Sequence, residues 1–159
     1  MKNSNIATAI ALRDLHCDSL DTIDDRILLQ KKVYLAQDLG LPLGYGFCWY
    51  IHGPYSSDLT DVAYQIIPEG FDAIEHGSYK KPYADIIASV NGFERHKSEC
   101  TTQINTVQWY ELLASIAYWY KHGYQSKDAI ITKIAKTKPQ FTQDQACTAY
   151  SAYYGVKVA

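Results

Sequence analysis

The sequence lacks the short motifs that mark the commonest catalytic and nucleotide-binding sites. It contains no G-x-G-x-x-G, no P-loop, no G-x-S-x-G and no H-E-x-x-H. These absences exclude the motif-defined forms of dinucleotide binding, phosphate binding, serine hydrolysis and zinc proteolysis. We therefore expect a protein that is not an enzyme and that carries no cofactor.

Closely spaced cysteines and long apolar runs are also missing. The four cysteines, Cys17, Cys48, Cys100 and Cys147, are far apart in sequence, and no C-x-x-C occurs. This spacing argues against a zinc site or a redox motif and favours reduced thiols in a cytoplasmic protein. The apolar run near the N-terminus is only about six residues long, too short for a signal peptide or a membrane anchor. We therefore expect no membrane association.

Charge of one sign does not dominate the chain, but tyrosine is abundant. The length of 159 residues fits a single domain over residues 1–159, and the net charge of −2 gives no global argument for nucleic acid.

There are 14 tyrosines. They predict a Tyr-rich helical core, with a dedicated binding surface as the alternative. A homodimer is a further expectation, because the aromatic residues of the C-terminal half exceed what one core hides: Tyr118, Trp119, Tyr120, Tyr124, Tyr150, Tyr153 and Tyr154.

Apolar periodicity and capping residues predict a mainly α fold, a compact multi-helix domain with a small β-element. The fifth of the predicted helices has apolar residues around its whole circumference, which indicates a central, buried helix. Residues 71–82 are poorly periodic and predict a loop, with room for one short strand. The helices are expected at 5–16, 24–39, 56–67, 83–95, 105–122, 127–136 and 143–154.

Aromatic and β-branched residues predict one strand at 45–51. Both of its faces are apolar, and one interpretation is a strand that is covered on both sides. The next residues, Gly53 and Pro54, cannot continue that strand. Ser56 or Ser57 then caps the following helix, and Pro54 fixes the backbone of the turn. The segment Gly53-Pro54-Tyr55-Ser56 is therefore interpreted as a structural strand-to-helix corner.

Three groups of side chains have catalytic or metal-binding potential. Cys48 and His52 would share one face if both lay on a strand, and a Cys–His pair can make an activated thiolate. No third orienting group accompanies them, so a packed cysteine and a turn histidine are the simpler interpretation. His76, His96 and His122 lie near acidic residues without the spacing of a metal-binding helix, and Glu94 with Glu99 is best explained as charge on a solvated helix.

The C-terminal segment is basic. From Lys121 to Ala159 six lysines stand against two aspartates, a side-chain charge of +4. Such asymmetry can mark a nucleic-acid face, and the helices at 127–136 and 143–154 would form a helix-turn-helix with a long turn. The candidate nucleic-acid face consists of Lys127, Lys133, Lys136 and Lys138.

Several motifs together resemble a known group of proteins. Leu29-Gln30-Lys31 with Tyr34, then Gly44-Tyr45, then Gly53-Pro54-Tyr55-Ser56 with Leu59, resembles the signature of YwgA-like proteins. These are similar to the wider group of SocA-like (Panacea) antitoxin domains. The late Lys138-Pro139-Gln140-Phe141 also resembles a pattern of YwgA-like chains. The resemblance covers residues 20–68 well and residues 105–150 loosely.

The resemblance implies a mostly helical domain with a winged-helix-like element that acts by binding partners. SocA-like domains serve as antitoxins that engage toxin proteins, so a protein partner, an antitoxin-like role and an origin on a mobile element are expectations here. The structural motif that carries the resemblance consists of Lys31, Tyr34, Gly53, Pro54, Tyr55 and Ser56. The alternative hypothesis is a winged-helix transcriptional regulator that uses the basic C-terminal helices.

Overall fold

A computed structural model describes all residues from Met1 to Ala159 and confirms the mainly α fold with a small β-element. It contains seven α-helices and one two-stranded antiparallel sheet. The chain divides into two compact units, Met1–Asn91 and Gly92–Ala159. The prediction of a single domain stays a prediction, because this division does not decide whether either unit folds alone.

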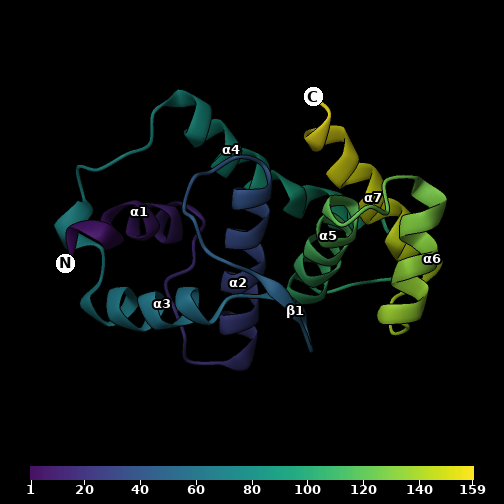
Figure 1. Cartoon of the computed structure of the whole chain (residues 1–159), viewed down its shortest axis with the longest axis horizontal. Coiled ribbons are helices and arrows are strands. Elements are labelled where there is room, and N and C mark those ends of the chain that lie inside the picture. The colour runs from purple at the N-terminus through teal and green to yellow at the C-terminus, as the bar shows by residue number, and fades with distance from the viewer. The chain divides into compact units, whose positions relative to one another are not determined.

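The first unit comprises four α-helices, and the hairpin follows the second of them (Figure 1). Helix α2 packs against α1 and against strand β2. The core of this unit is aliphatic and includes Leu12, Val33, Leu35 and Leu59, none of which is exposed to solvent. Its α-helices and strands are α1 (Ile6–Asp14), α2 (Ile23–Asp38), β1 (Cys48–Tyr50), β2 (Gly53–Tyr55), α3 (Ser57–Glu69) and α4 (Lys81–Gly92).

The predicted strand at 45–51 is wrong in extent and in environment. Only Cys48–Tyr50 is extended in a sheet, and Gly53–Tyr55 returns beside it, with Trp49 opposite Pro54. Proline fits here because a two-stranded sheet leaves each strand an outer edge that needs no amide donor. The strand is not covered on both sides, since Tyr50 is 58% exposed. The turn that joins the strands depends on Gly53, whose φ is +94°.

Helix starts follow the local sequence closely. Ser56, one of the two predicted caps, accepts a hydrogen bond from the backbone amide three residues later, and Ser126 and Thr142 do the same at the starts of their helices. Thr22 and Asp25 form a capping box at the start of α2. These caps satisfy amides that the first helical turn leaves without a partner.

The segment before α4 contains no strand. A short 3₁₀ helix, η2 (Asp72–Ile74), occupies part of it. The guanidinium of Arg13 on α1 donates to the carbonyls of Ile74 and Gly77, each at 2.7 Å. The Ile74 carbonyl also accepts from the Gly77 amide at 2.8 Å, so these carbonyls have partners without any strand pairing.

The second unit is a helical assembly in which α5, α6 and α7 pack pairwise (Figure 1). Helix α5 is its most buried element, as predicted, with Trp109, Leu112 and Ile116 fully enclosed. A 3₁₀ helix packs against both α5 and α7. The elements are η3 (Phe93–Glu99), α5 (Thr106–Lys121), α6 (Lys127–Thr137) and α7 (Gln143–Lys157). The winged-helix-like element stays a prediction.

Candidate functional site

The corner between the hairpin and α3 is held by two neighbouring side chains of α2. The Nε2 atom of Gln30 donates to the carbonyl of Ser56 at 2.9 Å, and its Oε1 accepts from the Ser56 amide at 2.9 Å. The ammonium of Lys31 donates to the carbonyl of Pro54 at 2.7 Å. Both side chains are buried. The structure therefore brings Lys31, Pro54 and Ser56 of the predicted motif together as a clamp on the backbone.

The other motif residues lie around the same corner. The ring of Tyr34 packs edge-on against Phe47, with ring centres 5.0 Å apart. Tyr55 lies in β2 and its hydroxyl receives a hydrogen bond from Thr60 on α3 at 3.0 Å. The motif thus positions backbone and aromatic rings, in agreement with a structural corner.

Beside this corner is a groove, formed by α2, the hairpin and α3, that encloses about 300 Å³. Its lining is mainly apolar and aromatic. Gln30 and Lys31, which clamp the corner, also reach the groove wall. The residues on which the argument depends are Ile23, Arg26 and Ile27 of α2, Tyr50 and Tyr55 of the hairpin, and Thr60, Ala63 and Tyr64 of α3. We call this the α2–α3 groove.

Large apolar side chains on the rim of the α2–α3 groove face solvent. Ile23 is 59% exposed, Tyr50 58% and Tyr64 51%. These three residues come from three different elements and all line the same groove. A cluster of exposed apolar and aromatic residues is typical of a surface that is covered by a partner.

Sequence reasoning missed this groove. The available signal was the spacing of Ile23, Ile27 and Gln30 along one face of α2, with Arg26 between them. That spacing marks a helical face but not what covers it. The opposite wall comes from α3, which the hairpin separates from α2 in sequence, and no local pattern connects the two walls.

Cys48 and His52 do not form the pair that the sequence suggested. The strand ends at Tyr50, so His52 lies in the turn and not on the same strand face. The exposed Cys48 thiol donates across the hairpin to the carbonyl of Tyr55, at 3.8 Å. The premise of a shared strand face is therefore wrong.

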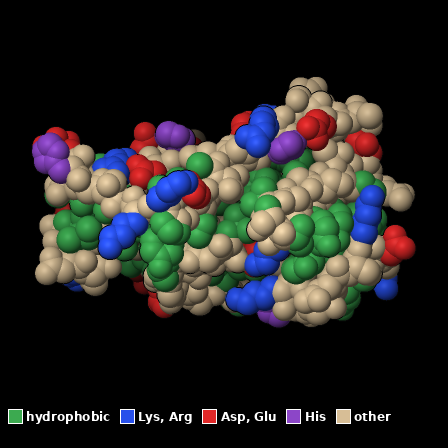
Figure 2. Space-filling view, turned by 90° about the horizontal axis from the view of Figure 1, so that it is seen from above, with side chains coloured by type: hydrophobic (Ala, Val, Ile, Leu, Met, Phe, Trp, Pro, Cys, Tyr) green, Lys and Arg blue, Asp and Glu red, His purple; other side chains and the backbone are tan.

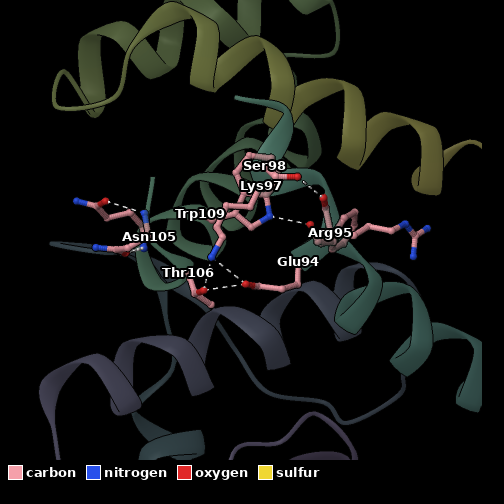
Figure 3. Close-up of polar contacts among 9 residues, drawn as sticks. Glu94, Arg95, Lys97, Ser98, Asn105, Thr106 and Trp109 are labelled. Carbon is pink, nitrogen blue, oxygen red and sulfur yellow. Dashed lines mark hydrogen bonds and ion pairs between the residues drawn. The ribbon is translucent and has the colours of Figure 1, made fainter. Parts of the chain in front are cut away.

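The acidic and histidine candidates are engaged in local contacts. Glu94 Oε1 accepts from Lys97 Nζ at 3.0 Å and from Thr106 Oγ1 at 2.8 Å, which ties η3 to the start of α5 (Figure 3). The indole of Trp109 reinforces this link through the carbonyl of Phe93. Glu99 binds His96 at 2.8 Å. Both carboxylates remain partly exposed on η3, in agreement with the interpretation of charge on a solvated helix.

The remaining histidines also lie apart. His76 is exposed beside Glu75, and His122 contacts the carbonyl and ring of Tyr118. No group of three or more His, Cys, Asp or Glu side chains is arranged so that it could hold a metal ion.

The four lysines of the candidate nucleic-acid face lie in different environments. Lys127 and Lys136 are exposed on α6. The ammonium of Lys133 lies 4.5 Å from the ring centre of Trp119, a cation–π contact. Lys138 is buried, 3.6 Å from the carboxylate of Glu111, and burial lowers its pKa. Lys138 therefore does not belong to such a face, because its charge is satisfied inside the protein.

The surface charge is mixed where it is visible. Figure 2 shows Lys and Arg side chains interspersed with Asp and Glu, and hydrophobic side chains between them. A dominant basic field, which nucleic-acid binding relies on, is not seen on that face.

Comparison with family models, with curated proteins and with solved structures finds no match to this chain. Among its helices, none combines the length and the apolar character that crossing a membrane requires.

Proposed function

We propose that this chain is a non-enzymatic protein-binding module of the SocA-like or YwgA-like kind, and that it binds its partner through the α2–α3 groove. The observation that carries the proposal is the exposure of Ile23, Tyr50 and Tyr64 around one groove. Burying such side chains against a partner removes apolar surface from water, which stabilises the complex.

The type of residue on the rim supports binding to a protein. Tyrosine contributes a large apolar ring with little loss of conformational freedom and keeps its hydroxyl for a polar contact, so it is frequent at binding hot spots. The ring of Tyr50 also packs against the ring of Tyr55, with ring centres 5.5 Å apart. A rim side chain that is already held in place loses less entropy when a partner covers it.

The resemblance at the corner supports an antitoxin-like role. Lys31, Pro54 and Ser56 of the resembling motif build the corner that carries the hairpin side of the groove. On this proposal the partner is a toxin-like protein in the cytoplasm. Its gene lies next to the gene of this chain, for example on a mobile element.

The proposal is tested by affinity purification of the tagged chain from cells that carry its gene. The test variant is Tyr50→Ala/Tyr64→Ala, and the matched control is Tyr154→Ala, which removes an exposed tyrosine of the second unit. We expect a stoichiometric protein to copurify with wild type and control but not with the double variant. Growth inhibition by the product of a neighbouring gene should also be relieved by co-expression of wild type or control, but not by co-expression of the double variant.

Two results would contradict the proposal. One is the absence of any stable protein partner together with no relief of growth inhibition. The other is a partner that binds the folded double variant as well as it binds wild type.

A second candidate function, DNA binding by a winged-helix type regulator, is supported by the exposed Lys127 and Lys136 of the basic C-terminal segment. Binding of this kind weakens steeply with salt. It predicts a gel shift at low salt that Lys136→Glu weakens. The absence of any shift at low salt would exclude it.

A further inference from the structure

The α2–α3 groove is short. Its α2 wall runs from Ile23 to Lys31, a rise of about 12 Å at the helical spacing of 1.5 Å per residue. Its volume of about 300 Å³ lies at the lower end of the range for pockets that enclose a drug-sized ligand. The groove therefore has room for one or two side chains of a partner and not for a whole helix.

One charged side chain of the groove wall retains unused hydrogen-bond donors. The Nη1 atom of Arg26 donates to the carbonyl of Leu20 at 2.8 Å. The other guanidinium N–H groups of Arg26 make no hydrogen bond within the chain, and no carboxylate lies within ion-pair distance of them. The neighbouring carboxylate of Asp25 accepts from Ser19 and from the amide of Thr22, and Arg26 acts on it only at longer range.

A guanidinium in this position has a definite preference. It carries a permanent positive charge, and its planar set of donors matches the two oxygens of a carboxylate. The apolar groove around Arg26 screens its charge less than bulk water does, so an ionic contact there is stronger than one on an open surface. Arg26 is half-buried, while Ile23 and Ile27 flank it on the same helix.

We infer that the α2–α3 groove binds a protein segment that presents an apolar side chain next to a carboxylate, and that Arg26 receives the carboxylate. The apolar side chain packs against Ile27, Ala63 and the tyrosine rings of the rim. This inference rests on the proposed function, since it names the chemistry of the partner segment at the same groove.

The first experiment is selection from a random dodecapeptide display library on the immobilised full chain. Binders are counter-selected on the Tyr50→Ala/Tyr64→Ala variant. We expect the retained peptides to be enriched in an Asp or Glu adjacent to Leu, Phe or Trp.

The second experiment measures affinity by fluorescence polarisation with the best peptide and its Glu→Gln or Asp→Asn counterpart. We expect the acidic peptide to bind wild type at least about tenfold more tightly than the amide peptide, as an ionic hydrogen bond implies. Arg26→Gln should abolish that preference, and Arg26→Lys should retain part of it. Arg95→Gln, the same change at an exposed position of the second unit, should leave binding unchanged.

A matched pair at Ile23 tests the role of Arg26 without altering it. Ile23→Glu places a carboxylate three residues before Arg26, close enough to pair with it, whereas Ile23→Gln has nearly the same shape and no charge. The acidic peptide should bind Ile23→Glu at least about tenfold more weakly than Ile23→Gln. Thermal melting of each variant shows that it is folded.

The outcomes separate this inference from the proposed function. Peptides that depend on Tyr50 and Tyr64 but carry no acidic preference, or that bind folded Arg26→Gln as well as wild type, overturn the inference and leave the proposed function standing. A library from which wild type retains nothing better than the double tyrosine variant also overturns the inference, and the copurification experiment alone then decides the proposed function.

Discussion

Lysine illustrates at the scale of single residues how the environment decides what a side chain can do. Lys31 and Lys32 are buried in the first unit, and their ammonium groups donate to the carbonyls of Pro54 and Leu15. Lys138 is buried beside Glu111, while Lys136 is exposed. A buried ammonium needs partners of this kind because desolvation of an unpaired charge is costly. Counting lysines along the sequence therefore overestimates the charge that a ligand can meet.

The cysteines predict a clear difference in reactivity. Cys17 is buried, and its burial raises the pKa of the thiol from 9.0 to about 12, whereas Cys48 is exposed. The thiolate is the reactive form, so Cys48 should react rapidly with iodoacetamide at pH 8 and Cys17 only after unfolding. Peptide mass spectrometry over time measures both rates.

The control for this experiment is Cys48→Ala, which should remove the labelling at position 48 without exposing Cys17. Rapid modification of Cys17 in the folded protein would contradict the described burial.

Acid stability should depend on Asp25. A hydrogen bond from Ser19 and further bonds from Thr22 hold the pKa of this carboxyl below its usual value of 3.8. As the pH falls, Asp25 therefore takes up its proton in the unfolded chain before it does so in the folded protein. The stabilisation is fully present above the pKa of Asp25 in the unfolded chain, and it is lost as the pH drops towards the lower pKa of Asp25 in the folded protein. Urea unfolding at a series of pH values should show a smaller acid loss for Asp25→Asn than for wild type.

Asp61→Asn is the matched control, because Asp61 is exposed and accepts no hydrogen bond from the chain. An acid profile of Asp25→Asn that coincides with wild type would show that Asp25 does not contribute.

At the scale of elements, the hairpin and α3 are fixed to α2 by side-chain contacts to backbone. Gln30 satisfies both the amide and the carbonyl of Ser56, and a second contact from its Nε2 reaches Thr60 at 2.8 Å. The same Ser56 caps α3. One glutamine thus connects the end of the sheet, the start of a helix and the wall of the groove.

Gln30→Leu should therefore destabilise the protein more than an ordinary polar-to-apolar change. Leucine fills similar space but leaves the buried amide of Ser56 without a partner, at about 1–3 kcal/mol, whereas the Ser56 carbonyl still accepts from the Thr60 amide at 3.2 Å. We expect the free energy of unfolding to fall by about 1–3 kcal/mol in chemical denaturation. Gln125→Leu, at an exposed position without a hydrogen bond, should change it by less than about 0.5 kcal/mol.

A Gln30→Leu variant as stable as the Gln125→Leu control would mean that the clamp does not hold the corner.

Helices and their caps could be predicted from the sequence because their causes are local. Ser126 and Thr142 cap helices where a hydroxyl precedes an apolar periodic run, and Gly70 follows the end of α3. The hairpin could not be predicted, because Pro54 pairs with Trp49 only where a two-stranded sheet leaves the edge open. The α2–α3 groove depends on tertiary placement of α2 and α3, and its key residues Arg26 and Tyr64 have no sequence pattern of their own.

At the scale of the whole molecule, the two compact units have cores of different composition. The first is built mainly on aliphatic residues such as Leu35 and Leu59, and the second on α5 with Trp109 and Tyr153 fully buried. The α2–α3 groove belongs entirely to the first unit, and the exposed lysines of α6 belong to the second. The two candidate functions therefore reside in different units and can be tested by separate sets of variants.

The distribution of tryptophan gives each unit its own optical signal. Trp49 lies in the hairpin of the first unit, and Trp109 and Trp119 lie on α5 of the second. In a Trp109→Phe/Trp119→Phe variant all indole emission comes from the hairpin, while Trp49→Phe leaves only the second unit emitting. If the chain is a single domain, urea unfolding of each variant should have the same midpoint by tryptophan emission as by circular dichroism. The midpoints of the two variants should also agree after correction for their different stabilities. Emission from Trp49 that changes well before the helical signal would instead reveal units that unfold separately.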